Sequence, residues 1–253
     1  MPINQVNAAS GRENTPQAPP LPRYYQTFHD AAAFRGLDDQ IIAELAKHAV
    51  IRRLANGSKW ISRRESAKGL ALIVEGGLRS TSIMSDGREY VFSIMGVGDL
   101  WGMVSSIDGD ANANDVYAYG ETVLLTIGRP LVIKLINSNP AFALWLMQLL
   151  CKRLRMANTV LEDQMLQPLR VRAARLLISM IATESDAASK PATPIVVTQD
   201  TLRKLLGCSR PTINQQLKQF ERDGLVHLEY GKVKITDLSG LRQICGDVAS
   251  VYF

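Results

Sequence analysis

TQDTLRKLLGCSRPTINQQLKQFERDGLV, residues 198–226, is the stretch that decides the fold, because it predicts two short helices joined by a tight turn. Thr198 is placed to cap the first helix, since its hydroxyl can accept a hydrogen bond from a first-turn amide. Gly207 can end that helix in the left-handed conformation at little cost. Ser209 is placed to cap the second helix, and Pro211 suits its first turn. The pattern predicts a helix-turn-helix.

Apolar residues of both predicted helices recur at helical spacing, which gives each helix one buried face. These buried positions are Leu202, Leu205, Leu206, Ile213, Leu217 and Phe220. The opposite side of the second helix then faces outward and is free to enter a DNA groove. With the two capping residues, the candidate DNA contacts are Thr198, Ser209, Arg210, Pro211, Asn214, Gln215 and Lys218.

A β-hairpin is predicted directly after the helix pair. Residues 225–228 and 233–235 alternate between apolar and polar side chains on either side of Gly231, and Lys232 stands at the tip. A helix pair followed by such a hairpin is a winged helix-turn-helix, and Lys232 would lie beside DNA phosphates. Charge agrees with this interpretation: residues 169–253 hold 12 Lys and Arg against 8 Asp and Glu, whereas residues 1–168 hold 17 against 16.

Composition sets the outer limits of the interpretation. The 253 residues are 46% hydrophobic and 21% charged, which is typical of a soluble globular chain of about two domains. No apolar run approaches the roughly 20 residues of a membrane helix, so we expect no membrane contact. Residues 1–22 lack the apolar core of a secretory signal and predict a disordered arm. Three scattered cysteines predict no metal site or disulfide framework and fit a cytoplasmic protein.

An antiparallel β-roll is predicted between residues 36 and 129. Short β-prone runs at residues 70–74, 78–84, 90–95 and 117–127 are separated by Gly and Asp turns. Residues 37–50 predict an amphipathic helix that precedes them. We therefore expect an α+β fold with a sensor domain at residues 23–139.

A long helix is predicted from residue 140 to 167, where the chain has no glycine. Its apolar positions alternate in steps of three and four, as in the seam of a coiled coil, which favours a homodimer. The same face could instead pack against the roll of its own chain. Pro168 breaks the helix and predicts a hinge between a dimerisation segment, residues 140–168, and a DNA-binding domain, residues 169–253. The predicted seam residues are Met147, Leu150, Leu154, Ala157 and Leu161.

The order of roll, long helix and winged helix-turn-helix resembles the Crp/Fnr family of bacterial transcription regulators. Four short motifs at matching places carry the resemblance: IVEGGL at residues 73–78, DGRE at 86–89, GDLWG at 98–102 and GCSR at 207–210. The resemblance implies a cytoplasmic homodimer that binds a two-fold symmetric site in double-stranded DNA and contacts RNA polymerase. It also implies that the chain is not an enzyme.

The family's recognition-helix arginine matches Arg210, whose guanidinium can bind guanine through two hydrogen bonds. Pro211 stands where the family often has glutamate, and Gln215 stands where it often has arginine. Pro211 can offer a base only apolar contact, and Gln215 suits adenine. We therefore expect a half-site that differs from that of the catabolite activator.

The position that corresponds to the family's cyclic-nucleotide pocket departs further from the pattern. Met103 cannot accept a hydrogen bond from a ribose hydroxyl, and Ala113 cannot neutralise a phosphate. We expect neither cyclic AMP nor cyclic GMP to bind; the alternative is a regulator that does respond to a cyclic nucleotide or another small effector in the roll. Residues of this degenerate pocket are Gly102, Met103, Ala113, Asn114, Ala157 and Asn158.

The cysteines and histidines of the chain limit which effectors the roll could hold. The three scattered cysteines are too few for an iron–sulfur cluster, and no histidine lies where a haem ligand is expected. Trp60, Trp101, Met95 and Met103 would either line an apolar pocket for an uncharged ligand or belong to the core of the roll. Cys151 would either form a disulfide between subunits or stay an inert thiol. An enzyme is disfavoured because no nucleophile, P-loop or zinc motif is present, and an interaction module that does not bind DNA is the third alternative.

Overall fold

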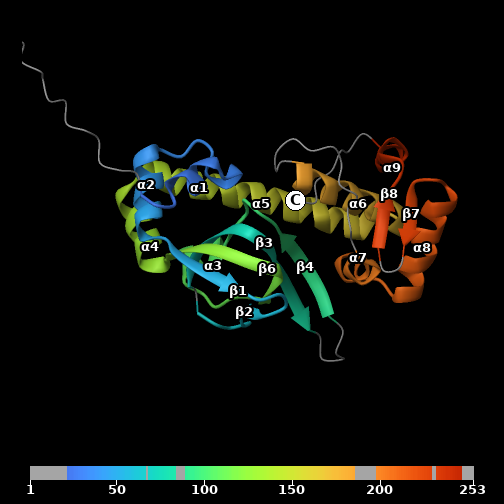
Figure 1. Ribbon diagram of the computed structural model, residues 1–253, viewed down its shortest axis with the longest axis horizontal. Helices are drawn as coiled ribbons and strands as arrows, with labels where there is room; N and C mark the ends of the chain where they lie inside the picture. Colours follow the sequence, from blue (N-terminus) through green and yellow to red (C-terminus); the bar gives the residue numbers. More distant parts are fainter. Residues whose placement is uncertain (1–21, 67, 84–88, 186–197, 230–231, 247–253) are drawn as a thin grey trace, which may run out of the picture.

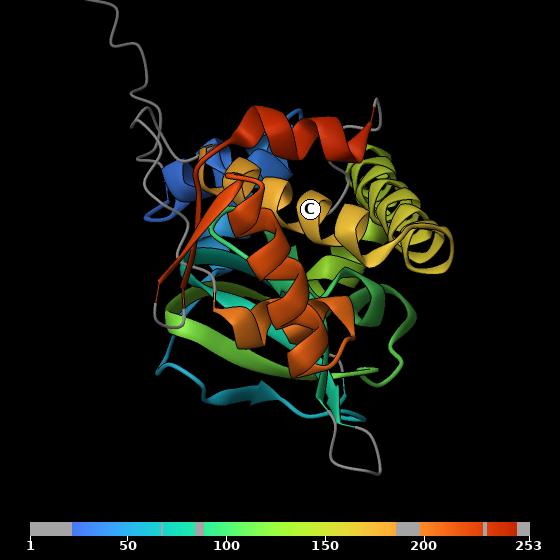
Figure 2. The same cartoon turned by 90° about the vertical axis from the view of Figure 1, so that its right-hand side faces the viewer.

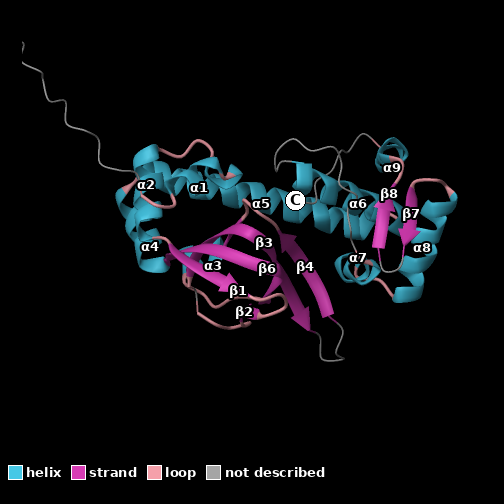
Figure 3. Ribbon diagram, in the orientation of Figure 1, coloured by secondary structure: helices cyan, strands magenta, loops and turns pink. Residues whose placement is uncertain are grey.

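The computed structural model describes residues 22–66, 68–83, 89–185, 198–229 and 232–246. The chain forms a β-roll, a long helix that runs along one side of it, and a smaller mixed domain at the far end of that helix (Figures 1 and 3). The expected arm at residues 1–22, apart from Pro22, lies outside the described residues, as do residues 86–88 and Gly231.

The roll is a six-stranded antiparallel sheet, as predicted. Strands β1 (Val50–Leu54), β6 (Asp115–Gly128), β3 (Gly69–Ile83) and β4 (Glu89–Met95) pair in that order. The short strands β2 (Lys59–Ile61) and β5 (Leu100–Trp101) pair with β6 and β3 respectively. All five strand pairings of the roll are antiparallel.

The prediction of separate strands at residues 70–74 and 78–84 is wrong, because both belong to β3. Gly76 and Gly77 form no turn; the register against β6 shifts there while the pairing continues. The Thr122 hydroxyl bonds the backbone of Gly77 across this irregularity, and Gly76 has a φ of 68°. A bulge of this kind bends a strand without ending it.

Helices cover one side of the roll, where its main core lies. They are α1 (Tyr25–Asp30), the 3₁₀ helix η1 (Ala32–Phe34), α2 (Asp39–His48), α3 (Met103–Asp108), α4 (Arg129–Ser138) and α5 (Pro140–Leu166), of which only the first half packs on the roll. Phe142, Trp145 and Leu146 of α5 are buried in this core. The Trp145 indole N–H also donates to the carbonyl of Ala33 at 3.1 Å, which fixes α5 against the roll.

The remaining elements form a domain with its own core (Figure 2). They are α6 (Leu169–Ser185), α7 (Gln199–Leu206), α8 (Arg210–Arg222), the hairpin β7 (Val226–Glu229) and β8 (Lys232–Ile235), and α9 (Leu238–Cys245). The predicted helix pair is therefore α7 and α8, and the predicted wing is β7 and β8. Sequence patterning did not predict α6 and α9, which complete the core around them.

A buried ion pair joins α5 to α6 across Pro168. The Arg175 guanidinium of α6 bonds the Asp163 carboxylate of α5, and the two side chains are 6% and 5% exposed. Arg175 also donates to the carbonyl of Cys245 at 3.2 Å, so the same guanidinium holds the end of α9.

Removal of one partner of this pair leaves the other charge buried and unpaired. We expect Asp163→Ala to lower the free energy of unfolding by about 3–5 kcal/mol, in urea titrations followed by circular dichroism. Asp163→Leu combined with Arg175→Met removes both charges and should recover most of that loss. A double variant as unstable as Asp163→Ala would contradict this account of the pair.

Candidate nucleic-acid interface and adjoining cavity

Both helices of the pair are capped, α7 by Thr198 and α8 by Ser209, and α8 also has a buried apolar face. The Thr198 hydroxyl accepts from the amide of Thr201 at 3.1 Å, and the Ser209 hydroxyl accepts from the amide of Thr212 at 3.3 Å, as predicted for the two caps. Gly207 ends α7 with a φ of 63°, in the left-handed conformation that glycine adopts at little cost. The predicted apolar face of α8 (Ile213, Leu217 and Phe220) is fully buried.

The opposite side of α8 is exposed at the end of the molecule (Figures 1 and 2). We call Arg210, Pro211, Gln215 and Lys218 the reading face; all four are exposed. Asn214 differs from the expectation, because it is half-buried and its side-chain oxygen has no hydrogen-bond partner among the described residues. Lys232 is exposed at the start of β8, opposite Glu229 of β7.

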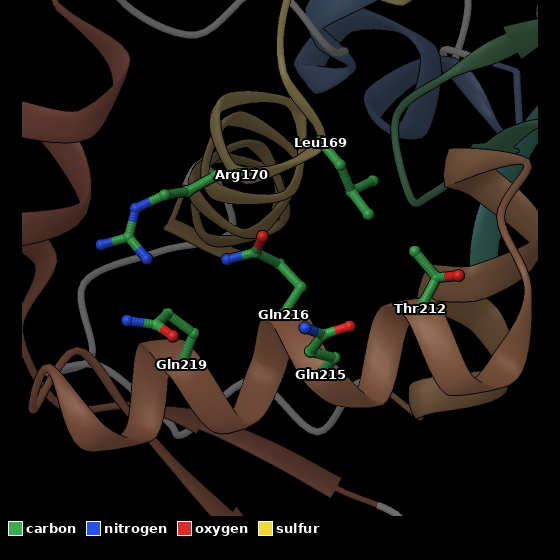
Figure 4. A pocket seen from close by; sticks show the side chains of 6 residues that line it. All are labelled: Leu169, Arg170, Thr212, Gln215, Gln216 and Gln219. Atoms are coloured by element: carbon green, nitrogen blue, oxygen red, sulfur yellow. The ribbon is translucent and has the colours of Figure 1, made fainter.

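A hollow of about 430 Å³ lies between α8 and the start of α6 (Figure 4). Arg170 of α6 stands at its side, in an ion pair with Asp223 at 2.7 Å and 5.1 Å above the ring of Phe220. Amide and guanidinium groups of this kind donate hydrogen bonds to phosphate oxygens in protein–DNA contacts. Of the residues that line the hollow, only Gln215 was among the predicted DNA contacts. The full lining is Leu169, Arg170, Thr212, Gln215, Gln216 and Gln219.

A second cavity of about 300 Å³ lies inside the roll, bordered by β3, β4, α3 and α5. Four residues of the predicted pocket line it: Gly102, Met103, Ala113 and Asn114. Gly102 has a φ of 92°, and a side chain there would collide with the carbonyl of Gly69, so this corner needs glycine. The other two predicted pocket residues, Ala157 and Asn158, are exposed on α5 and do not line the cavity of this chain.

Sequence reasoning missed the cation of this cavity, Arg153. It reaches the cavity from α5, donates to the carbonyl of Leu100 and lies 3.7 Å from the sulfur of Met95. Burial lowers the pKa of the Arg153 guanidinium, with Asp99 as an opposing charge, and burial raises the pKa of Asp99. The charge is thus held in a poorly hydrated place against the turn between β4 and β5.

The tryptophans and methionines of the roll divide between core and cavity. Trp60 packs against Trp101 at a ring-centroid distance of 4.7 Å, beside a core that includes Trp101 and Met95. Trp101, Met95 and Met103 also line the cavity, whereas Trp60 does not. Both alternatives for these residues therefore describe part of the arrangement.

An apolar stripe runs along the outer side of α5. The predicted seam residues Met147, Leu154 and Leu161 are 53%, 63% and 58% exposed, and Ala157 is exposed between them. Leu150 instead packs, partly buried, against the core of the roll, and the exposed Cys151 takes its place on the stripe. The alternative of a helix packed on its own roll is thus realised at Leu150 and in the first turns of α5.

Within the described parts of the chain, no group of three His, Cys, Asp or Glu side chains could hold a metal ion. The helices described there are all too short or too polar to cross a membrane. The three cysteines are free thiols, and burial raises the pKa of Cys208 and of Cys245.

Two family models match the chain: the cyclic nucleotide-binding domain over residues 51–139 and the Crp-like helix-turn-helix domain over residues 171–244. The CRP-like cAMP-activated global transcriptional regulator of Mycobacterium tuberculosis is 27% identical over 210 residues, which cover 82% of this chain and 93% of that protein. The HTH-type transcriptional regulator Cmr of the same organism is 29% identical over 201 residues, 79% of this chain and 78% of Cmr. The structure of FixK2 from Bradyrhizobium japonicum has the same fold, with a TM-score of 0.68 at 19% identity over 79% of this chain and 99% of FixK2.

Proposed function

We propose that this chain, which belongs to the Crp/Fnr family of DNA-binding transcription regulators, acts as a homodimer on a two-fold symmetric operator and is not controlled by cyclic AMP. The observation that carries the proposal is the reading face of α8. This face is exposed at one end of the molecule, on a helix that is capped at its start and buried along its opposite side. A surface of this kind can enter a major groove, and Lys232 of the wing can approach the adjoining phosphates.

Two-fold symmetry follows from the apolar stripe on α5. One recognition helix contacts a single half-site, whereas a pair related by a two-fold axis contacts two. Exposed Met147, Leu154 and Leu161 recur every seven residues, a spacing that suits packing against the same stripe of a second chain. We place the regulator in the cytoplasm, where it would meet its operator and RNA polymerase.

Independence from cyclic AMP rests on the lining of the cavity in the roll. Met103 and Ala113 offer neither an acceptor for a ribose hydroxyl nor a charge for a phosphate. The guanidinium of Arg153 is already bonded to the carbonyl of Leu100. The alternative is control by a cyclic nucleotide or another small effector; the cationic Arg153 on the cavity wall and the cAMP-activated relative favour it.

Selection of operators from a random-sequence duplex library tests the function. We expect wild-type protein to enrich a two-fold symmetric site and to bind it less tightly as salt rises. Arg210→Ala should lose selection at one base pair of each half-site, at a cost of about 1–3 kcal/mol, and keep most of its low-salt binding. Arg242→Ala on α9 makes the same change of charge away from the reading face and should select the wild-type site. An unchanged site for Arg210→Ala would contradict the assigned orientation of α8.

The homodimer is tested at the stripe of α5. Leu154→Asp, or Leu161→Asp, places a charge at the centre of the proposed seam and should give a monomer in light scattering. Gln148→Asp introduces the same side chain on α5 outside the stripe and should leave the dimer intact. A dimeric Leu154→Asp protein would rule out this seam.

Thermal-shift titration with millimolar cyclic AMP or cyclic GMP tests the effector. We expect no stabilisation, because a ligand raises the melting temperature only if it binds the folded state. The cAMP-activated relative from Mycobacterium tuberculosis, titrated in parallel, serves as the positive control. A rise of several degrees for this chain would support the alternative.

A further inference from the structure

Strand β4 of the roll contacts the DNA-binding domain directly. At its first residue, the Glu89 carboxylate lies 2.7 Å from the ammonium of Lys204 on α7, and the two side chains are 21% and 18% exposed. Arg79 of β3 holds the same carboxylate from the other side at 3.0 Å, and Asp200 lies 2.9 Å from Lys204. Four charges thus join the two domains at a partly buried place.

The next residue of β4 extends this contact to α5 and to the turn before α8. The Tyr90 hydroxyl accepts from the side-chain amide of Gln164 at 2.8 Å. Its ring faces Gly207, where a side-chain carbon would come within 3.4 Å of the ring. Tyr90 therefore touches the end of the long helix and the residue that separates α7 from α8.

The orientation held by these contacts leaves the reading face of α8 exposed. Figures 1 and 2 show α8 at the end of the molecule opposite α2 and α4, with the DNA-binding domain against β4 on its inner side. In this arrangement the reading face is uncovered by the roll.

We propose that Glu89 and Tyr90 are positioning residues for DNA recognition, which hold α7 and therefore α8 in the DNA-competent orientation from across the domain boundary. The proposal rests on the proposed function and adds a way in which DNA binding could be controlled. Ser93 and Met95 of the same strand line the cavity of the roll, so β4 joins the cavity to the helix-turn-helix. Loss of the contact leaves α8 intact and reduces the fraction of molecules that present it correctly, which lowers the apparent affinity in proportion.

Neutral substitutions on each side of the contact test this proposal. Glu89→Gln, Lys204→Met and the double variant are compared with wild type for operator affinity, by fluorescence anisotropy, and for radius of gyration, by small-angle X-ray scattering. We expect Glu89→Gln to weaken operator binding about tenfold, within the usual range of coupling between sites, and to raise the radius of gyration. The operator affinity of the double variant should be no lower than that of the single variant with the lower affinity, since both changes break the same contact.

The sign of the effect separates positioning from general electrostatics. Glu89→Gln removes a negative charge, which by itself favours DNA binding, so a loss of affinity requires another cause. Glu75→Gln makes the same change at an exposed position of β3 and should not weaken binding. Tyr90→Ala, which leaves all the charges in place, should reproduce the loss.

Either an undiminished operator affinity or an unchanged scattering curve for Glu89→Gln overturns the proposal. The proposed function fails separately, if wild-type protein selects no symmetric operator. In that case the scattering curves still report whether Glu89 and Tyr90 hold the DNA-binding domain against the roll.

Discussion

The anchoring of α5 at both ends is the constraint on which the rest of the structure depends. Its first turns are buried with Trp145 in the core of the roll, and its last turns are tied through Asp163 to Arg175 of α6. A helix is stiff over this length, so its two attachments set the separation of the roll from the DNA-binding domain. The contacts of β4 at Glu89 and Tyr90 join the roll to α7 and to the end of α5 at a further place.

Local signals predicted α2, the long helix α5, the pair α7 and α8, the hairpin and three strands of the roll, but not α1, α3, α4, β1, β2 or β5. The caps at Thr198 and Ser209 and the glycine at position 207 act within one turn of helix, and the structure places all three as expected. The bulge at Gly76 and Gly77 was misread as a turn, because both use glycine in similar patterns. Helices α6 and α9 were missed because their apolar residues complete a core whose shape depends on the other elements of the domain.

From helical periodicity alone, a site was predictable only where one segment supplies it, whereas the cavity residues Gly102, Met103, Ala113 and Asn114 came from the family resemblance. The reading face comes from α8 alone, and its exposed side could be derived from helical periodicity. Arg153 and Arg170 join their sites from other elements, and nothing in their sequence surroundings indicates what they approach. The seam prediction was incomplete for the same reason: Leu150 fits the apolar pattern but packs against the roll and does not face solvent. Long-range packing decides such cases.

Two adjacent residues of α5 face different sides of the helix: Arg153 reaches into the cavity, while Leu154 lies on the outer stripe. A ligand that drew Arg153 away from Leu100 would therefore act on α5 one residue away from the outer stripe. In a homodimer built on this stripe, each cavity would lie one residue of α5 away from the interface between the two chains.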